Sequence, residues 1–511
     1  MSSTVLILGT IVLYLCGMLA VGAFFSKSSA NSSNDFYLGG RKLGPFVTAM
    51  SAEASDMSSW LLMGLPGVAY YFGIADAAWT AIGLGIGTYI NWLVVAKRIR
   101  RYSVVAGDSY TLPEFFSKRY HDNKNVLACF AAIVIIVFFI PYTASGFAAV
   151  GKLFNSLFGW DYMTAATFGA VVVVSYTILG GFMAVSTTDL IQSIFMSIAL
   201  IIVLVFGINT AGGWSAVCEN ANSLAGYISL TSMTNIMTKE VSAYGIITII
   251  STMAWGLGYF GMPHLLLRFM AIEDEEKISL SRRVASIWVV IAMAVAIVIG
   301  VVGYGMSANG SIELLETSPA AESVIVKIAG LLSTHGVAAT ICAGIILAGI
   351  LASTMSTADS QLLAAASSVS ENLVKEFFGI KLTQKQTLLV SRGTVLVISA
   401  IALFLARDPN SSVFTIVSFA WAGFGAAFGP VVLLALFWKR SNKNGALAGM
   451  IAGGAMVFIW KFLVRPLGGA WNIYELLPAF IIACAANVIV SLMTKAPDQS
   501  ILDEFEAARI K

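Results

Sequence analysis

The sequence predicts an all-α protein that crosses a membrane many times, and two observations carry this prediction. Of its 511 residues, 58% are hydrophobic and only 11% are charged, with a mean hydropathy of +0.85. A soluble domain carries about 25% charged residues, so the composition excludes an ordinary soluble protein. Apolar windows of about 20 residues, long enough to cross a bilayer as a helix, also recur along the whole chain.

These windows give thirteen predicted spans. Their approximate limits are 4–25, 46–72, 75–96, 126–150, 162–184, 188–210, 243–266, 284–306, 337–369, 388–406, 412–437, 444–464 and 473–494. The first has no basic segment before it and no small-residue cleavage site after it, so we expect a retained span and not a signal peptide. Five widely spaced cysteines form no CxxC pair and indicate neither a zinc site nor a disulfide framework.

The basic residues predict the orientation. With an extracellular N-terminus, 24 of the 30 Lys and Arg residues fall in segments on the cytoplasmic side. Such an excess marks the cytoplasmic face of a membrane protein. We therefore expect the N-terminus outside, the C-terminus in the cytoplasm and an odd number of spans.

One predicted span carries charges where none is expected. The stretch Ser51–Gly67, SAEASDMSSWLLMGLPG, places Glu53 and Asp56 inside the 46–72 span, where each charge costs roughly 2.5–3.5 kcal/mol. Neighbouring serine hydroxyls compete with helical backbone bonding. They are Ser51, Ser55, Ser58 and Ser59. The pattern predicts a helix interrupted half-way, its freed backbone groups facing a wet cavity, as at the binding sites of secondary transporters.

A second interruption follows about 200 residues later. The stretch Trp255–His264, WGLGYFGMPH, holds three glycines and Pro263, which weaken or kink a helix. Paired interruptions in two halves of a chain indicate a transporter site, although Gly and Pro are also common in membrane helices. The pairing predicts a five-helix repeat at 46–210 and another at 243–437. The remaining parts are then a first helix and inner loop (1–45), an outer loop (211–242), and two peripheral helices with a short cytoplasmic tail (438–511).

A row of hydroxyls follows in the stretch Leu351–Leu363. Ser353, Ser356, Thr357 and Ser360 are spaced i, i+3, i+4 and i+7, on one face of a helix. With carbonyls freed at an Ala54–Met57 break, these hydroxyls could supply the several oxygen ligands that a hard cation such as sodium requires. Hydroxyl faces also join membrane helices by hydrogen bonds, and this alternative stays open. Asp359 lies beside the row as a further acid in a predicted span.

Other polar and aromatic residues are candidates with open alternatives. Asp189 either serves a cation site or is an exposed acid near a helix N-terminus, where it suits the helix dipole. His264 and Arg268 are expected near the inner surface, where their span ends. Aromatic side chains either form an apolar wall for a small ring or pack in the core. They are Trp60, Tyr142, Trp255 and Tyr259.

Several stretches together resemble the sodium/solute symporter family, most closely its proline-carrying branch. They are GGRKLGPFVTAMSAEASDMSSWLLMGLPG, YTASG, WGLGYFGMPH followed by RFMA, and MST followed by QLL. The likeness runs in order over nearly the whole chain. It implies a LeuT-type fold of inverted five-helix repeats, with one helix before the core and two after it.

The resemblance also implies roles for matched positions. Sodium would be bound by the Ala54, Met57 and Ser353 carbonyls and the Ser356 and Thr357 hydroxyls. Asp56 and Arg41 are implied in coupling. Asp189, Asp359 and Ser360 mark a possible second cation position. Substrate would contact Ser58, Ser59, Tyr142, Trp255, Tyr259, Pro263 and Ser360. The chain departs from the family at four positions: Glu53 and Ser59 replace glycine, Ser360 replaces cysteine, and Asp359 replaces a small or hydroxylic residue.

The expected function is sodium-coupled import of L-proline by alternating access across a bacterial inner membrane. No enzyme activity, cofactor other than the sodium ion, nucleic acid or obligatory protein partner is expected. One alternative keeps the fold and carries pantothenate or a monocarboxylate. A basic side chain in the cavity would favour such an anion, and the predicted site has none. An ion channel or an intramembrane aspartyl protease built on Asp56 and Asp189 fits less well, since a repeated filter segment and a GxGD motif are both missing.

Overall fold

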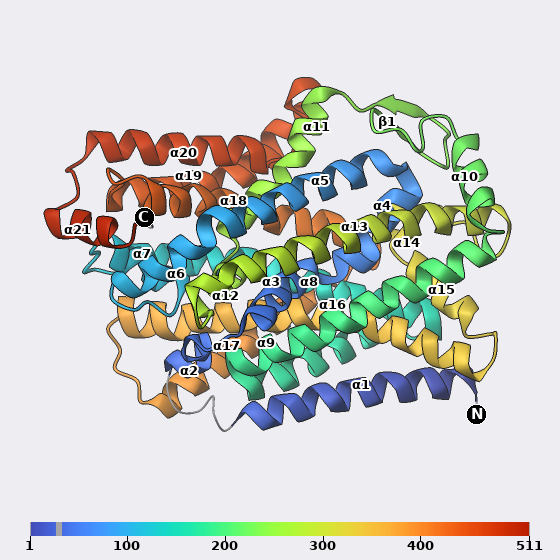
Figure 1. Cartoon of the computed structure of the whole chain (residues 1–511), viewed down its shortest axis with the longest axis horizontal. Coiled ribbons are helices and arrows are strands. Elements are labelled where there is room, and N and C mark those ends of the chain that lie inside the picture. Colours follow the sequence, from blue (N-terminus) through green and yellow to red (C-terminus); the bar gives the residue numbers. More distant parts are fainter. Residues whose placement is uncertain (1, 27–32, 510–511) are drawn as a thin grey trace.

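The computed structural model describes residues 2–26 and 33–509, and helices make up nearly all of this part of the chain. Figure 1 shows the long helices lying side by side along the long axis of the molecule. The N-terminus lies toward one end of this axis and the C-terminus toward the other. Residues 27–32 of the expected inner loop lie outside the described residues.

Ten described helices are long and apolar enough to cross a membrane, and a pair of helices bent by 48° makes an eleventh. The ten are formed by α1 (Ser3–Ser26), α5 (Ile74–Ile90) continued by η4 (Asn91–Val95) and α6 (Ala96–Val105), α8 (Val126–Phe158), the second part of α9 (Tyr162–Thr210), α13 (Ile278–Ala308), α16 (Val337–Ser367) continued by η7 (Ser368–Phe377), α17 (Gln384–Leu405), α18 (Val413–Phe437), α19 (Lys443–Ile459) continued by η8 (Trp460–Val464), and α20 (Leu476–Met493).

The other two predicted spans are also helical but differ in form. The 46–72 segment is divided into α3 (Pro45–Ser59), η3 (Trp60–Gly64) and α4 (Leu65–Phe72). The 162–184 segment is the first part of α9, which Gly181 interrupts with a non-helical φ of 63° and ψ of −175°. Every segment that hydropathy marks as a span is therefore helical in the structure.

Both predicted interruptions are present. In α3 the break falls at Ser58, one residue beyond the expected Ala54–Met57 stretch. The backbone of Ser58 has a φ of 24°, which residues other than glycine rarely adopt. The second is the bent pair: α11 (Ile246–Met253) tightens into the 3₁₀ helix η5 (Ala254–Gly261), and α12 (Pro263–Ala271) begins after it. Pro263 suits this position because the N–H group of the first helical residue makes no hydrogen bond within the helix, so its absence in proline costs nothing there.

Short elements gather at the two ends of the bundle. Figure 1 shows α2 (Ser33–Leu38), α7 (Leu112–Arg119) and α21 (Gln499–Ala507) at the end that holds the C-terminus. At the opposite end lie α10 (Trp214–Ser223), β1 (Ser232–Thr234) and α14 (Ser318–Ala321). The remaining described elements are η2 (Gly39–Arg41), β2 (Val241–Ala243), which pairs antiparallel with β1, η6 (Glu275–Lys277), α15 (Val324–Leu332), η9 (Arg465–Leu467) and η10 (Gly469–Trp471).

The broken helices lie in the interior. All residues of α3 from Thr48 to Ser59 are buried, and this helix packs against α9, α13 and α16. On another side of the bundle, α5 and η5 approach each other backbone to backbone. A Cβ atom on Gly87 would overlap the carbonyl of Gly256, and one on Gly83 would overlap that of Met253. These glycines therefore set how closely the second broken helix packs against α5.

This close approach yields a test with a matched control. Gly87→Ala should lower the free energy of unfolding by about 1–3 kcal/mol, since the methyl group must displace backbone. Gly85→Ala, on the same helix, meets only a Val290 methyl group at 3.5 Å and should be tolerated. Thermal unfolding of the purified variants measures the difference. Equal melting temperatures for the two variants would contradict the packing described.

Candidate functional site

The break in α3 lies against the hydroxyl face of α16. The Ser356 hydroxyl is 2.8 Å from the Ala54 carbonyl oxygen, to which it donates, and 3.2 Å from that of Ser353. The Thr357 hydroxyl is 3.3 Å from the same Ser353 carbonyl. Four of the five atoms expected to bind sodium thus meet here. The fifth, the Met57 carbonyl, accepts the Trp60 N–H group. Oxygen atoms alone are the donor set of a hard cation.

Asp56 connects three elements next to this contact. Its Oδ2 accepts the Tyr259 hydroxyl of η5 at 2.7 Å, and its backbone carbonyl accepts the Tyr142 hydroxyl of α8 at 3.2 Å. The Trp60 indole donates to the same carbonyl at 3.3 Å. Asp56 is fully buried. A change at this residue therefore acts on both broken helices and on α8 together.

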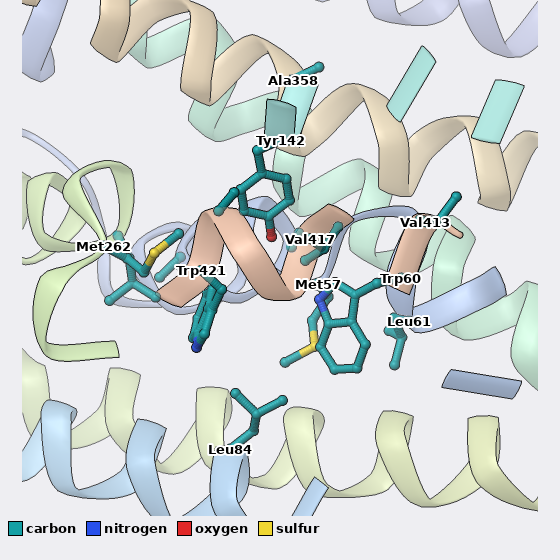
Figure 2. Close-up of a cluster of buried hydrophobic side chains, with 14 of the residues drawn as sticks. Met57, Trp60, Leu61, Leu84, Tyr142, Met262, Ala358, Val413, Val417 and Trp421 are labelled. Atoms are coloured by element: carbon teal, nitrogen blue, oxygen red, sulfur yellow. The ribbon is translucent and has the colours of Figure 1, made fainter. Parts of the chain in front are cut away.

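A small cavity adjoins the break. It is lined by Ser58, Ser59, Tyr142 and Thr357, among others. The centre of a water-sized sphere can move within about 10 Å³ of this cavity. The cavity therefore has room for one water molecule. Figure 2 shows the buried hydrophobic cluster that contains Tyr142, together with Met57 and Trp60 from the region of the break. A solute the size of an amino acid enters only if these helices move apart.

Two of the aromatic candidates, Trp255 and Tyr259, do not line this cavity, whereas Tyr142 does. The Trp255 ring stacks on that of Tyr474 with centroids 5.3 Å apart, and the Tyr259 ring meets Trp421 edge-on at 5.1 Å. These two rings are therefore part of the buried aromatic core. Pro263, also expected to contact substrate, begins α12 and is fully buried.

The largest difference from the sequence analysis concerns Arg268. It was expected near the inner surface, but its side chain is only 1% exposed. Its guanidinium is 3.1 Å from Asp189 Oδ2, 2.6 Å from the Ser360 hydroxyl and 3.0 Å from the Ser51 hydroxyl. The Ser51 hydroxyl also donates to Asp189 at 2.6 Å. A basic side chain therefore lies between residues expected at a second cation position.

Two neighbours complete this network. The His264 carbonyl accepts from the Arg268 guanidinium at 2.8 Å, and His264 too is fully buried, which differs from its expected place near the surface. Asp359 is buried on α16 beside Ser360. Asp189 and Asp359 thus both lie in the buried region around Arg268, a residue that the hydropathy pattern places at the end of a span.

Arg41 lies apart from these buried groups. Its guanidinium donates to Asp108 at 3.1 Å, to the Ser109 carbonyl at 2.7 Å and to the Met270 carbonyl. Burial lowers the pKa of Arg41, and the Asp108 carboxylate opposes that shift. Nearby, Leu43 pairs with Ile272 as an isolated bridge. Arg41 therefore ties the segment before α3 to the end of α12, the second broken helix.

Comparison with known proteins decides the family. The sequence profile of the sodium:solute symporter family matches residues 36–453. The chain belongs to this family. It is 42% identical over 504 residues to the sodium/proline symporter of Haemophilus influenzae, covering 98% of this chain and 97% of the relative. It is also 42% identical to the high-affinity proline transporter PutP of Bacillus subtilis, covering 96% and 98% of the two chains.

The fold has a solved counterpart. A Na⁺-coupled sialic acid symporter, caught in a substrate-bound outward-open state, shares the fold with a TM-score of 0.78. The two sequences are 18% identical, and the match covers 97% of this chain and 99% of the other. The all-α, LeuT-type architecture expected from the sequence is thereby confirmed.

The buried ion pair gives a second prediction. Asp189→Asn should lower the free energy of unfolding by about 3–5 kcal/mol, because it removes the carboxylate that pairs with the buried Arg268 guanidinium. A double change, Asp189→Leu with Arg268→Met, should recover much of that loss because it removes both members of the ion pair. Thermal unfolding of the single and double variants measures both effects. A single variant as stable as the unchanged protein would contradict this description.

Proposed function

We propose that this symporter imports L-proline together with sodium across a bacterial cytoplasmic membrane by alternating access. The observation that carries the proposal is identity of 42%, over nearly full length, to relatives named for proline transport in two distant bacteria. The oxygen atoms gathered between α3 and α16 support sodium as the coupling ion. On this proposal the N-terminus is outside, the C-terminus is cytoplasmic and 46–210 and 243–437 are the inverted repeats.

Sodium would join α3 to α16 at the break. The Ala54, Met57 and Ser353 carbonyls and the Ser356 and Thr357 hydroxyls would bind it. For this the Ser356 hydroxyl turns a lone pair toward the ion in place of the proton that it now donates to Ala54. The Met57 carbonyl likewise gives up the Trp60 N–H group. Sodium then favours the conformation in which the five oxygens converge, because it binds that conformation more tightly.

Proline would bind beside the same break. Its carboxylate suits the N–H groups freed near Ser58 and Ser59, where a half-helix begins. Tyr142 lines the same cavity and is bonded to the backbone of Asp56. Because the cavity has room for only one water molecule, proline could bind only if the aromatic core of Trp255 and Tyr259 separated from α3. Their rings would then cover the apolar ring of proline.

The driving force is adequate for uptake without ATP. One sodium ion that enters down a membrane potential of about 100 mV and a tenfold gradient supplies roughly 3.7 kcal/mol. This corresponds to about 400-fold accumulation of the solute. Arg41 is proposed to act in coupling through its contacts with the end of α12.

The anion alternative gains no support from Arg268. This guanidinium is buried and donates to Ser360, but it is paired with the Asp189 carboxylate. It also does not line the cavity at the break. A zwitterionic solute, which needs no net counter-charge, therefore fits the site better than a monocarboxylate.

Uptake into proteoliposomes tests the function directly. Radiolabelled L-proline should accumulate with an inward sodium gradient and not with a proton gradient alone, and Asp56→Ala should abolish accumulation. Pantothenate and acetate are the matched control solutes and should not accumulate. Sodium-driven uptake of either solute with proline inert would overturn the proposed substrate, and proline uptake driven by protons alone would overturn sodium coupling.

A further inference from the structure

A second group of buried oxygen atoms lies on the opposite face of α3. Glu53 points to α5 and η4, whereas the carbonyl of its neighbour Ala54 meets α16. Glu53 Oε1 accepts the Thr88 hydroxyl at 3.0 Å and the Trp92 indole at 2.8 Å. Glu53 is thus fixed in place by two donors, away from the site proposed above.

Three oxygen atoms in this region are buried and accept no hydrogen bond. They are Glu53 Oε2, Asp56 Oδ1 and Asn91 Oδ1. All three residues are fully buried. Among residues 2–26 and 33–509, no Lys, Arg or His side chain pairs with Glu53 or Asp56 within 4.0 Å. Buried carboxylates are normally paired or bind a metal ion, so this arrangement lacks a positive partner.

Hydrogen bonds and helix spacing connect these residues in a closed ring. Asp56 accepts from the Tyr259 hydroxyl, and the Tyr259 carbonyl accepts the Asn91 amide at 3.0 Å. That bond fixes the amide nitrogen of Asn91, so its free atom is the oxygen. Asn91 lies one turn from Thr88, which returns to Glu53. Glu53 and Asp56 are themselves one turn apart on α3, close enough for their charges to interact.

We propose that Glu53, Asp56 and Asn91 form a second cation site, which takes sodium between α3 and η4, beside the second broken helix. Two carboxylates and an amide offer oxygen ligands only, without thiol or imidazole, and so suit a hard cation. The Tyr259 hydroxyl of η5 donates to Asp56, so an ion bound here is linked to the second broken helix through that hydrogen bond. The inference rests on the proposed sodium-coupled transport and adds a second ion to its cargo.

Equilibrium binding of radioactive sodium to the purified protein in nanodiscs, without proline, tests the site. The unchanged protein should bind two ions per chain and Glu53→Gln should bind one, while Glu53→Asp, which keeps the carboxylate, should retain two. Asp76→Asn is the matched control. It removes a carboxylate from the other end of α5, where the Tyr244 hydroxyl donates to it at 2.6 Å, and it should retain two ions. Melting curves show that each variant is folded.

The outcomes separate the site from the proposed function. One sodium ion in both the unchanged protein and Glu53→Gln would overturn the second site and would indicate that the two carboxyl groups share a proton. Proline uptake measured on the same preparations tests the function independently. Uptake with one bound sodium ion rejects only the second site, and two bound ions without proline uptake reject only the proposed substrate.

Discussion

The structure depends on the contact between the broken α3 and the hydroxyl face of α16. A bilayer offers no water to the backbone groups that a broken helix frees, so protein groups must satisfy them. At Ser58 the helix gives up regular bonding, and side chains take over. The Ser356 hydroxyl reaches the Ala54 carbonyl, and the Tyr142 hydroxyl and the Trp60 indole reach that of Asp56. A cation that replaces such donors would convert a packing contact into a binding site.

Charge is the second constraint on this interior. Arg268 and Asp189 form a buried ion pair where several helices meet, and the hydroxyls of Ser51 and Ser360 accept further hydrogen bonds from the guanidinium. Glu53 and Asp56, on the other face of α3, have hydrogen-bond donors but no cation among the described residues. The two acidic regions of the core thus differ, since one contains a cationic side chain and the other contains none among the described residues.

The sequence alone predicted much of the fold and part of the site. Hydropathy located the spans, and Glu53, Asp56 and the neighbouring serines located the break to within one residue of Ser58. Helical periodicity placed Ser356 and Thr357 on one face, which does meet Ala54. Arg268 was missed because its direction is set by Asp189, 79 residues away in the chain, and no local pattern contains that pairing. The stacking of Trp255 on Tyr474 is equally remote, so it too lay beyond a local pattern.

The central claim is that sodium at the α3–α16 contact prepares the site for proline. The most direct test measures the affinity of the purified protein for radiolabelled proline with and without sodium. Binding of the two should be coupled, so sodium should tighten proline binding at least tenfold. Ser356→Ala should lose most of this coupling, and Ser367→Ala, whose hydroxyl bonds only its own helix at 2.8 Å, should keep it. Equal proline affinity with and without sodium in the unchanged protein would contradict the account.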